Sequence, residues 1–358
     1  MKSSMTVAGL MSGTSLDGLD IAIVRFSLTG DEWKYEVLAA TTLPYSDLWY
    51  ERLDKAINSN GRDLAALHAD YGRFLGEMVK SFLKQTGLRI DLIASHGHTI
   101  FHEPEKGFTF QLGCGASIAA NSGITTVSDF RTLDVALGGQ GAPLVPVGDK
   151  LLFPEYHAWL NLGGFANISV KSGEEMLAWD LAPANMALNY LAEQYGKKYD
   201  AEGLIASSGQ LDKELLRQFL LLEYFNRPAP KSLGREWFEK EFKPLLDADE
   251  TSLADKMATV CEFLALILAK DCQQYGVQKM LVSGGGTHNS YLMARIEYHC
   301  NTEVVVPDRL TVDYKEAIVF AFLGCLRMLS RPNALKSVTG AQRNSVGGAV
   351  YLGEVKSE

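Results

Sequence analysis

The sequence predicts two related α/β domains, because one order of strands and helices occurs twice along its 358 residues. In the first half, a meander of three strand-like segments ends near YEVLAATTL. Helices are expected near residues 46–58, 63–84 and 116–121, and strands at DLIAS and ITTVS. From Trp159 the pattern recurs, with strands at AWLNL, ISVK and EMLAWD, then helices, and strands at KMLVS and TEVVV. Three strands followed by alternating helices and strands is the plan of an α/β domain.

The glycine-rich segment GGQGAP, at residues 138–143, marks the crossing between the two halves. We place the first domain at residues 1–130 and the second at residues 131–358. A helix is expected from Lys315 to Leu329, because a proline follows shortly after it and disfavours further helix. The C-terminal tail beyond this helix is expected to pack back on the first domain.

Composition limits the classes of function. A formal net charge of -9 argues against nucleic acid or an anionic membrane surface as a partner, because both need a basic footprint. No window approaches an uninterrupted membrane span, and the N-terminus lacks a basic region ahead of a long apolar stretch. The cysteines lack CxxC spacing, so neither a disulfide framework nor a zinc site is indicated. These are Cys114, Cys261, Cys272, Cys300 and Cys325. We therefore expect a cytoplasmic protein that binds a small molecule.

A turn rich in hydroxyls and glycine, SGTSLDG, lies between two apolar strands. Its amides can bind phosphates while an acid positions Mg²⁺, which we expect near Asp17. It is not a Walker P-loop, because GK[ST] is absent and a strand follows. A plain glycine-rich hairpin is the alternative. The corresponding turn GGFAN in the second half favours phosphate binding, since paired hairpins hold ATP in actin, hexokinase and the heat-shock chaperone ATPases.

Two further segments end strands that correspond in the two halves. SGGG, at residues 283–286, precedes a helix and could accommodate adenosine against bare backbone, or could be a flexible loop. His96, His98 and His102 follow the strand DLIAS. Because a metal site would need a further ligand, hydrogen bonding to a polar ligand is the favoured interpretation of these histidines.

Two carboxylates have both a structural and a functional interpretation. Asp180 ends a strand and precedes Pro183, which suits the first turn of a helix, so it is either a helix N-cap or a general base. Asp313 and Glu316 have the spacing of a capping box before an apolar helix. The residues alone do not choose between these interpretations.

Long segments of the chain resemble signature segments of the anhydro-N-acetylmuramic acid kinases, in the same order. They include GLMSGTSLDGLD, SHGHTIFHEP, SDFRTLDVALGGQGAPLVP, NLGGFANIS, RPAPKSLGREWF, SGGGTHN and KEAIVFAFL, and they cover nearly the whole chain. The resemblance implies two ribonuclease-H-like domains of the actin/hexokinase type with a nucleotide cleft between them. It also implies a homodimeric kinase that uses ATP and Mg²⁺. Such an enzyme opens 1,6-anhydro-N-acetylmuramic acid with water and phosphorylates its O6, giving N-acetylmuramic acid 6-phosphate in peptidoglycan recycling.

The resemblance also assigns roles. Asp180 would activate water, and Glu316 would assist near the phosphates. The sugar would be bound by Arg131 and by the segment His96, Gly97, His98 and Thr99. ATP would be bound by Ser12, Gly13, Thr14, Ser15, Asp17, Gly18, Gly163, Gly164, Gly284, Gly285 and Gly286.

The chain departs from the family pattern beside the expected base. Where the family usually reads DTGPGN, this chain reads DLAPAN, so that Leu181, Ala182 and Ala184 replace a threonine and two glycines. His98 stands where glutamine is usual, and Asn189 where an acid is common. We expect the added methyl groups to narrow the pocket beside the reacting centre, which leaves the exact sugar open.

Two other functions fit the same residues. A conventional kinase would deprotonate an open hydroxyl of a related amino sugar with the same carboxylate. A nucleotide-gated sugar-binding protein would bind both ligands without turnover. ATP consumption measured with the anhydro sugar and with its open form discriminates among the three.

Overall fold

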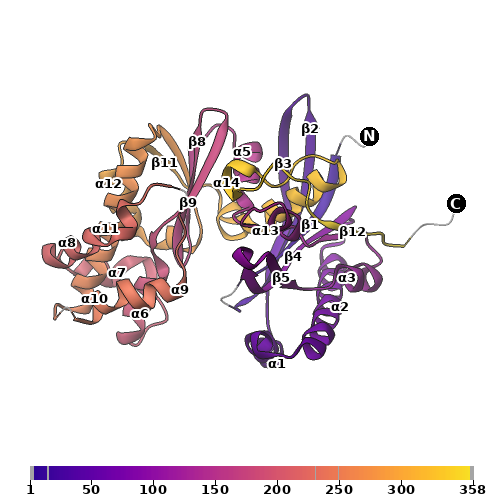
Figure 1. Cartoon of the computed structure of the whole chain (residues 1–358), viewed down its shortest axis with the longest axis horizontal. Helices are drawn as coiled ribbons and strands as arrows, with labels where there is room; N and C mark the ends of the chain where they lie inside the picture. The colour runs from indigo at the N-terminus through magenta and orange to yellow at the C-terminus, as the bar shows by residue number, and fades with distance from the viewer. Residues whose placement is uncertain (1–3, 14–15, 230, 249, 355–358) are drawn as a thin grey trace. The chain divides into compact units, whose positions relative to one another are not determined.

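The computed structural model describes residues 4–13, 16–229, 231–248 and 250–354, which form two compact units (Figure 1). The first unit contains the chain up to Phe153 and again from Tyr314, and the second is the continuous segment Pro154–Asp313. The sequence-based boundary at residue 130 therefore lies upstream of the observed division. The segment after residue 130 stays with the first unit because the buried Asp134 carboxylate accepts hydrogen bonds from the Gly141 amide and the Thr339 hydroxyl, both at 2.8 Å.

The first unit is built on a seven-stranded sheet in the order β12-β6-β4-β1-β2-β3, with β5 paired to β4. β1, β2 and β3 are an antiparallel meander, whereas β4 runs parallel to β1 and β6 parallel to β4. The strands are β1 (Ser4–Ser12), β2 (Gly18–Thr29), β3 (Glu32–Pro44), β4 (Leu92–Glu103), β5 (Phe108–Leu112), β6 (Thr126–Ser128) and β12 (Ala349–Tyr351). The helices are α1 (Asp47–Asp54), α2 (Gly61–Thr86), α3 (Gly115–Ser122), α4 (Thr132–Ala136), α5 (Val145–Leu152), α13 (Arg309–Met328), which begins in the second unit, and α14 (Lys336–Thr339).

Helices cover both faces of this sheet, and successive residues of β2 face opposite helical layers, as strand geometry requires. Ile21 and Ile23 belong to the core cluster that contains Tyr71 of α2. Phe26 instead packs against Phe322 of α13, with the ring centroids 5.2 Å apart. Because both faces of these strands are buried, polar side chains can reach solvent or a ligand mainly at the strand ends.

The second unit repeats this plan with a five-stranded sheet in the order β11-β10-β7-β8-β9. β7, β8 and β9 are antiparallel, whereas β10 runs parallel to β7 and β11 parallel to β10. The strands are β7 (Ala158–Leu162), β8 (Phe165–Ser172), β9 (Glu175–Pro183), β10 (Lys279–Ser283) and β11 (Glu303–Val305). The helices are α6 (Asn185–Gln194), α7 (Leu204–Ser208), α8 (Lys213–Leu221), α9 (Arg235–Trp237), α10 (Lys243–Ala248), α11 (Leu253–Gln274) and α12 (Ser290–His299).

The two sheets share one strand order, in which a three-stranded antiparallel meander is continued by two parallel strands. This is the ribonuclease-H-like arrangement, so the predicted pair of related α/β domains is confirmed. The sequence analysis did not predict β5 or β12. β12 pairs antiparallel with β6, Val350 opposite Val127, so this part of the C-terminal tail packs on the first unit.

Helix α13 crosses from the second unit into the first, and its backbone departs from helical geometry at Tyr314, with φ -118° and ψ 15°. Before its first turn, the Asp308 carboxylate accepts hydrogen bonds from the amide and hydroxyl of Thr311, at 3.1 and 2.7 Å. The capping box predicted for Asp313 and Glu316 is wrong, because the Asp313 carboxylate lies against His288 and Arg309, and no described hydrogen bond joins it to the Glu316 amide.

A buried ion pair lies beside the two places where the chain passes between units. Lys315 Nζ is 2.8 Å from the Asp149 carboxylate, and the two side chains are only 6% and 3% exposed. Asp149 lies in α5, just before the first crossing, and Lys315 follows the second crossing directly. The pair therefore ties together, within the first unit, the two segments that lead to the second.

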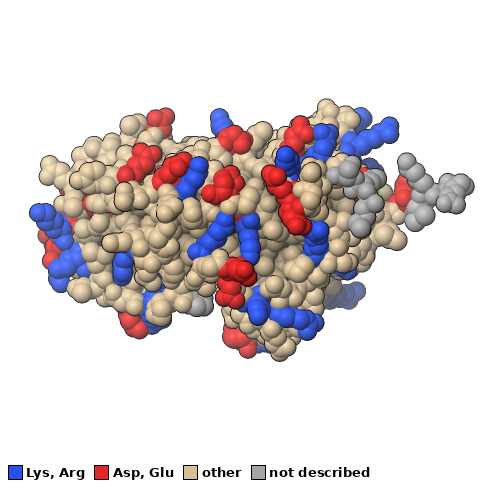
Figure 2. Space-filling view, turned by 90° about the horizontal axis from the view of Figure 1, so that it is seen from above, with Lys and Arg blue, Asp and Glu red and all other residues tan. Residues whose placement is uncertain are grey.

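The described surface shows no concentration of one charge on the face in Figure 2, where acidic and basic side chains are interspersed. Such a face lacks the continuous basic footprint that nucleic acid binding needs. Among the helices that the structure describes, none is both long and apolar enough to cross a membrane.

We predict that Asp149→Asn destabilises the protein by about 3 kcal/mol, because it leaves the Lys315 ammonium buried without its counter-charge. The urea midpoint of unfolding measures the change. Glu51→Gln, which removes an exposed carboxylate paired with Lys55, is the matched control and should leave that midpoint unchanged. Equal midpoints for the two variants would show that the buried pair does not stabilise the first unit.

Candidate functional site

In the first unit, the end of β1 lies beside the middle of β4, and their pairing brings together two residues predicted to bind different ligands. Ser12, predicted to bind phosphate, is in register with His98, predicted to bind the sugar. Ser12 Oγ lies 3.0 Å from His98 Nδ1 and accepts a hydrogen bond from the Tyr45 hydroxyl at 2.7 Å. The Tyr45 hydroxyl in turn lies 2.6 Å from that of Tyr71. The Ser12 hydroxyl is therefore buried and engaged within the protein.

The rest of the predicted phosphate turn lies between β1 and β2. Thr14 and Ser15 fall outside the described residues. The Gly13 carbonyl accepts a hydrogen bond from the Leu16 amide at 3.3 Å, and Asp17 is exposed. Among the described residues of this turn, Asp17 is the acid, and its side chain is exposed to solvent.

Arg131 is held by His96 and by backbone. Its Nε and one terminal nitrogen lie 3.0 and 2.8 Å from His96 Nε2, and its other terminal nitrogen donates to the Gly141 carbonyl at 2.7 Å. His96 Nδ1 lies 2.9 Å from the Gly97 carbonyl, so Nδ1 carries the proton and Nε2 accepts. Burial, reinforced by the Arg131 charge, holds the pKa of His96 well below its usual range. Both ring nitrogens are thus engaged, and Arg131 is the member of this pair with N–H groups left for a ligand.

Electrostatic interactions link Arg131 to Glu316, and Glu316 to Asp20. Burial lowers the pKa of Arg131 to about 10, and the Glu316 carboxylate opposes that shift. Part of the Glu316 side chain is exposed to solvent. Desolvation by the surrounding protein raises the pKa of Glu316. The positive charge of Arg131 opposes this rise, and the negative charge of Asp20 adds to it. Asp20 lies in β2 and accepts a hydrogen bond from the Thr42 hydroxyl at 2.6 Å. Sequence reasoning missed Asp20, although SGTSLDGLD shows a second acid shortly after the first.

The remaining residues of the predicted sugar segment lie along β4. Gly97 has φ +77°, and a Cβ there would lie 2.3 Å from the Leu112 carbonyl oxygen, so no side chain fits. Thr99 is partly buried and lies 3.5 Å from the Gln111 amide nitrogen. His102 is exposed, and its Nδ1 lies 3.1 Å from a threonine hydroxyl of β5. In the part of the chain that the structure describes, no three His, Cys, Asp or Glu side chains form a group that could hold a metal ion.

In the second unit, the predicted phosphate turn supports the start of α6. The Gly163 carbonyl accepts a hydrogen bond from the Asn185 amide at 3.1 Å. The Gly164 carbonyl accepts from the amides of Ala184 and Met186, both at 2.9 Å. The first amides of α6 are therefore satisfied by this turn rather than by a capping side chain.

The predicted adenosine segment follows β10 and lies against the end of β7. Gly284 has φ +88°, and a Cβ there would lie 2.4 Å from Asn161 Oδ1. A Cβ on Gly286 would lie 2.6 Å from that of Leu162. A Cβ on Gly285, in contrast, would meet no described atom nearer than 4.0 Å. Two of the three glycines are thus required by close packing, and Gly285 faces open space.

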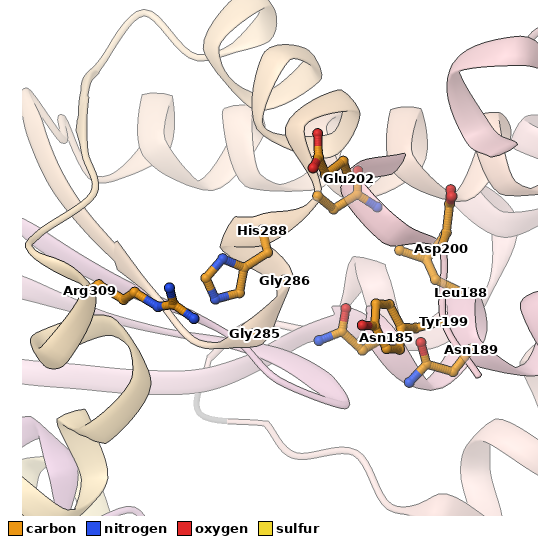
Figure 3. Close-up of a pocket in the computed structure, with 11 residues that line it drawn as sticks. Asn185, Leu188, Asn189, Tyr199, Asp200, Glu202, Gly285, Gly286, His288 and Arg309 are labelled. Carbon is orange, nitrogen blue, oxygen red and sulfur yellow. The ribbon is translucent and has the colours of Figure 1, made fainter. Parts of the chain in front are cut away.

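Gly285 and Gly286 line a pocket of about 450 Å³ that lies entirely within the second unit (Figure 3). Figure 3 shows His288 and Arg309 toward one end of the pocket and Asn185, Asn189 and Tyr199 toward the other. The full lining is Asn185, Leu188, Asn189, Tyr199, Asp200, Glu202, Gly285, Gly286, His288, Asn289 and Arg309. Its size and its mixture of polar and apolar groups suit a small organic ligand such as a nucleoside.

Asp180 lies near the end of β9 and is half-buried. One oxygen of its carboxylate accepts a hydrogen bond from the Leu233 amide at 2.8 Å. Its backbone carbonyl accepts from the Tyr224 hydroxyl at 2.6 Å. Burial raises the pKa of Asp180, and the hydrogen bond from Leu233 opposes that rise.

The helix-cap interpretation of Asp180 is wrong. Helix α6 begins at Asn185, and Ala184 stands at its N-cap without a side-chain hydrogen bond. Pro183, expected in the first helical turn, instead ends β9 and pairs with Phe165. The Asp180 carboxylate is therefore held by the loop at Leu233 and takes no part in the helix.

The departure DLAPAN belongs to the core of the second unit. Leu181, Ala182 and Ala184 are at most 1% exposed and lie in one cluster with residues such as Leu160 and Ile168. The expectation that the added methyl groups narrow a ligand pocket is therefore wrong, because these groups pack against other core side chains.

Comparison with known proteins identifies the family to which this chain belongs. The family model described as anhydro-N-acetylmuramic acid kinase matches residues 5–353. This chain belongs to that family. The kinase of Gloeobacter violaceus is 36% identical, with 97% of each chain covered. Those of Aliivibrio fischeri and Streptomyces coelicolor are 38% and 37% identical, covering 96% and 98% of this chain and 98% and 94% of their own. The family consists of ATP-dependent sugar kinases, as the resemblance implied.

We predict that Gly285→Val weakens ATP binding by about tenfold or more while the protein stays folded. Its backbone is unstrained, so the new side chain occupies pocket volume without distorting the loop. Calorimetric titration with ATP measures the affinity. Gly61→Ala, at an open position of the first unit, is the control and should not change it. Unaltered nucleotide affinity in folded Gly285→Val would remove adenosine from this pocket.

Proposed function

We propose that this protein is the cytoplasmic kinase that hydrolytically opens 1,6-anhydro-N-acetylmuramic acid and phosphorylates its O6 with ATP, in peptidoglycan recycling. Membership of the kinase family supports the reaction class and the amino-sugar substrate. We also propose that the protein is a homodimer, as the resemblance to the family implies.

The observation that carries the proposal is the environment of Asp180. Leu233 fixes one carboxylate oxygen, and within the described residues the other oxygen has no hydrogen-bond partner. A half-buried carboxylate with a raised pKa, held from one side and not used as a helix cap, has the properties of a general base.

In the proposed reaction, Asp180 takes one proton from a water molecule as the water oxygen bonds to the anomeric carbon. The bond from that carbon to O6 breaks, and O6 bonds to the γ-phosphorus of ATP. The bond from the γ-phosphorus to the bridging oxygen breaks, and ADP leaves. Arg131, with Glu316 near it, would meet the charged parts of the substrates.

The proposal assigns the adenosine, the phosphates and Mg²⁺ of the bound nucleotide to separate groups of residues. The pocket along Gly285 and Gly286 would hold the adenosine, and the turns at Ser12 to Gly18 and at Gly163 would lie along the phosphates. Mg²⁺ commonly uses one or two carboxylates together with phosphate oxygens and water. The exposed Asp17, with Asp20 and Glu316 in the same unit, supplies such carboxylates, and the ion would neutralise phosphate charge.

We predict that turnover in heavy-oxygen water places label on the anomeric carbon and none in the phosphoryl group, when the product is examined promptly by mass spectrometry. A conventional hydroxyl kinase would incorporate no solvent oxygen at either position. Label in phosphate would instead show hydrolysis of ATP. Binding of both substrates without any product would indicate a sugar-binding protein.

We predict that Asp180→Asn lowers kcat by roughly 10²–10⁴-fold, the usual contribution of a positioned base. Calorimetric ATP affinity should stay normal, because the change keeps the side chain's shape. Asp271→Asn, at another half-buried acid of the second unit whose pKa is also raised by burial, is the matched control and should retain most activity. Near-normal turnover by Asp180→Asn would exclude Asp180 as the base.

We predict that kcat/KM for the sugar falls on the acid side at a higher pH than an ordinary aspartate would give. The base works only when ionised, and burial raises its pKa above 3.8. A pH profile from about 4 to 8 checks this. A fall confined to the range of an unperturbed aspartate would contradict the assignment.

A further inference from the structure

Asp180 lies at the edge of the second sheet. β9 is the last strand in the order β11-β10-β7-β8-β9, so within the described residues it pairs with a strand on one side only. Ala182 pairs with Ala166 of β8 and Asp180 pairs with Asn167, which leaves Leu181 without a partner residue. This β-bulge directly follows Asp180, and bulges commonly redirect the side chains beside them. Regular strand pairing therefore does not fix the conformation of Asp180 by itself.

Three groups of Asp180 are held by residues that lie far along the chain. Its amide donates a hydrogen bond to the Lys231 carbonyl at 3.1 Å, and its carbonyl accepts one from the Tyr224 hydroxyl at 2.6 Å. One carboxylate oxygen accepts from the Leu233 amide at 2.8 Å. Backbone N–H and C=O groups at a sheet edge need such partners, because no further strand supplies them. These three residues therefore cover the edge of β9 at the expected base.

Tyr224 anchors these contacts to the rest of the second unit. It is only 4% exposed, and its ring packs against Trp237 with the centroids 5.4 Å apart. The Lys231 ammonium donates to the Tyr224 carbonyl at 3.2 Å and lies 4.8 Å from the centroid of the Tyr224 ring. An ammonium near an aromatic face is attracted to it, and the attraction is stronger where water is partly excluded. The Leu233 side chain packs against the core of the unit, so both residues that hold the Asp180 amide and carboxylate are themselves fixed.

We propose that Tyr224 and Lys231 are positioning residues for the reaction: they keep Leu233 on one carboxylate oxygen of Asp180, which leaves the other oxygen available to the attacking water. The inference rests on the proposed function, because it takes Asp180 as the general base. A base must lie within hydrogen-bond reach of the proton that it removes, and a displacement of about 1 Å can cost about 10²-fold in rate. Neither Tyr224 nor Lys231 takes a proton in this scheme.

Substitutions of the two positioning residues should change kcat and not KM. Tyr224→Phe removes the hydroxyl and keeps the ring on which Lys231 lies. Its kcat should fall about tenfold or more, while KM for the sugar and for ATP stays within about twofold, because the placement of the base changes and the binding groups do not. Lys231→Met should have the same effect, and Lys231→Arg, which keeps a cation that can donate to the carbonyl, should recover most of kcat.

The matched control is Tyr190→Phe, which removes a hydroxyl that donates to Asp247 in the same unit. It should leave kcat unchanged. Normal kcat in both Tyr224→Phe and Lys231→Met, with the proteins folded, would overturn the inference.

The pKa of Asp180 is a readout that a merely structural role would not move. The Leu233 hydrogen bond opposes the rise in this pKa that burial causes, so weakening of that bond in Tyr224→Phe should raise the pKa of Asp180 further. Carbon NMR of the side-chain carboxyl, assigned by its absence in Asp180→Asn, measures the pKa without turnover. The acid limb of kcat/KM should move to higher pH with it. Asp271 of α11, whose charge acts on both Tyr224 and Lys231, is kept in every variant.

The NMR measurement separates the inference from the proposed function. An unchanged or lowered pKa of Asp180 in Tyr224→Phe would overturn the inference, whatever the reaction. A raised pKa in an enzyme whose turnover does not depend on Asp180 would instead overturn the proposed function alone.

Discussion

Two neighbouring parallel strands in each sheet decide where the polar groups of this protein meet. Parallel strands bring their carboxyl ends to the same edge, so residues far apart in sequence become neighbours there. The pairing of β1 with β4 sets Ser12 beside His98, and the pairing of β7 with β10 sets Asn161 opposite Ser283. The residues of each pair lie far apart in the sequence, and the parallel pairing of the strands makes them neighbours.

Burial then sets the chemical character of each group. It keeps His96 and His98 neutral, so their rings act as hydrogen-bond partners rather than as charges. It also raises the pKa of the half-buried Asp180, which makes this carboxylate a stronger base than an unperturbed aspartate. One physical cause therefore supplies both the neutral and the basic members of the candidate site.

The sequence predicted the duplicated fold and the residues at the strand ends, because hydrophobic periodicity and glycine turns are local signals. The sequence-based predictions were wrong at positions where contacts between distant segments determine the local structure. Asp180 and Pro183 looked like the start of a helix, but the loop at Leu233 holds Asp180 on a strand that continues to Pro183. The methyl groups of Ala182 and Ala184 looked like a change in a pocket, yet they fill the core. The hydroxyl network of Ser12, Tyr45 and Tyr71 joins β1, the loop after β3 and α2, and no local pattern reveals it.

The order of the segments along the chain has a consequence for synthesis on the ribosome. The second unit is one continuous segment, so every residue it needs has been made once the chain reaches Asp313. The first unit begins earlier but finishes later, because β6 lacks its edge partner until Val350 has been added. An exposed strand edge is a site of wrong pairing. During translation, the older half of the molecule therefore keeps an open sheet edge until residues 349–351 have been added.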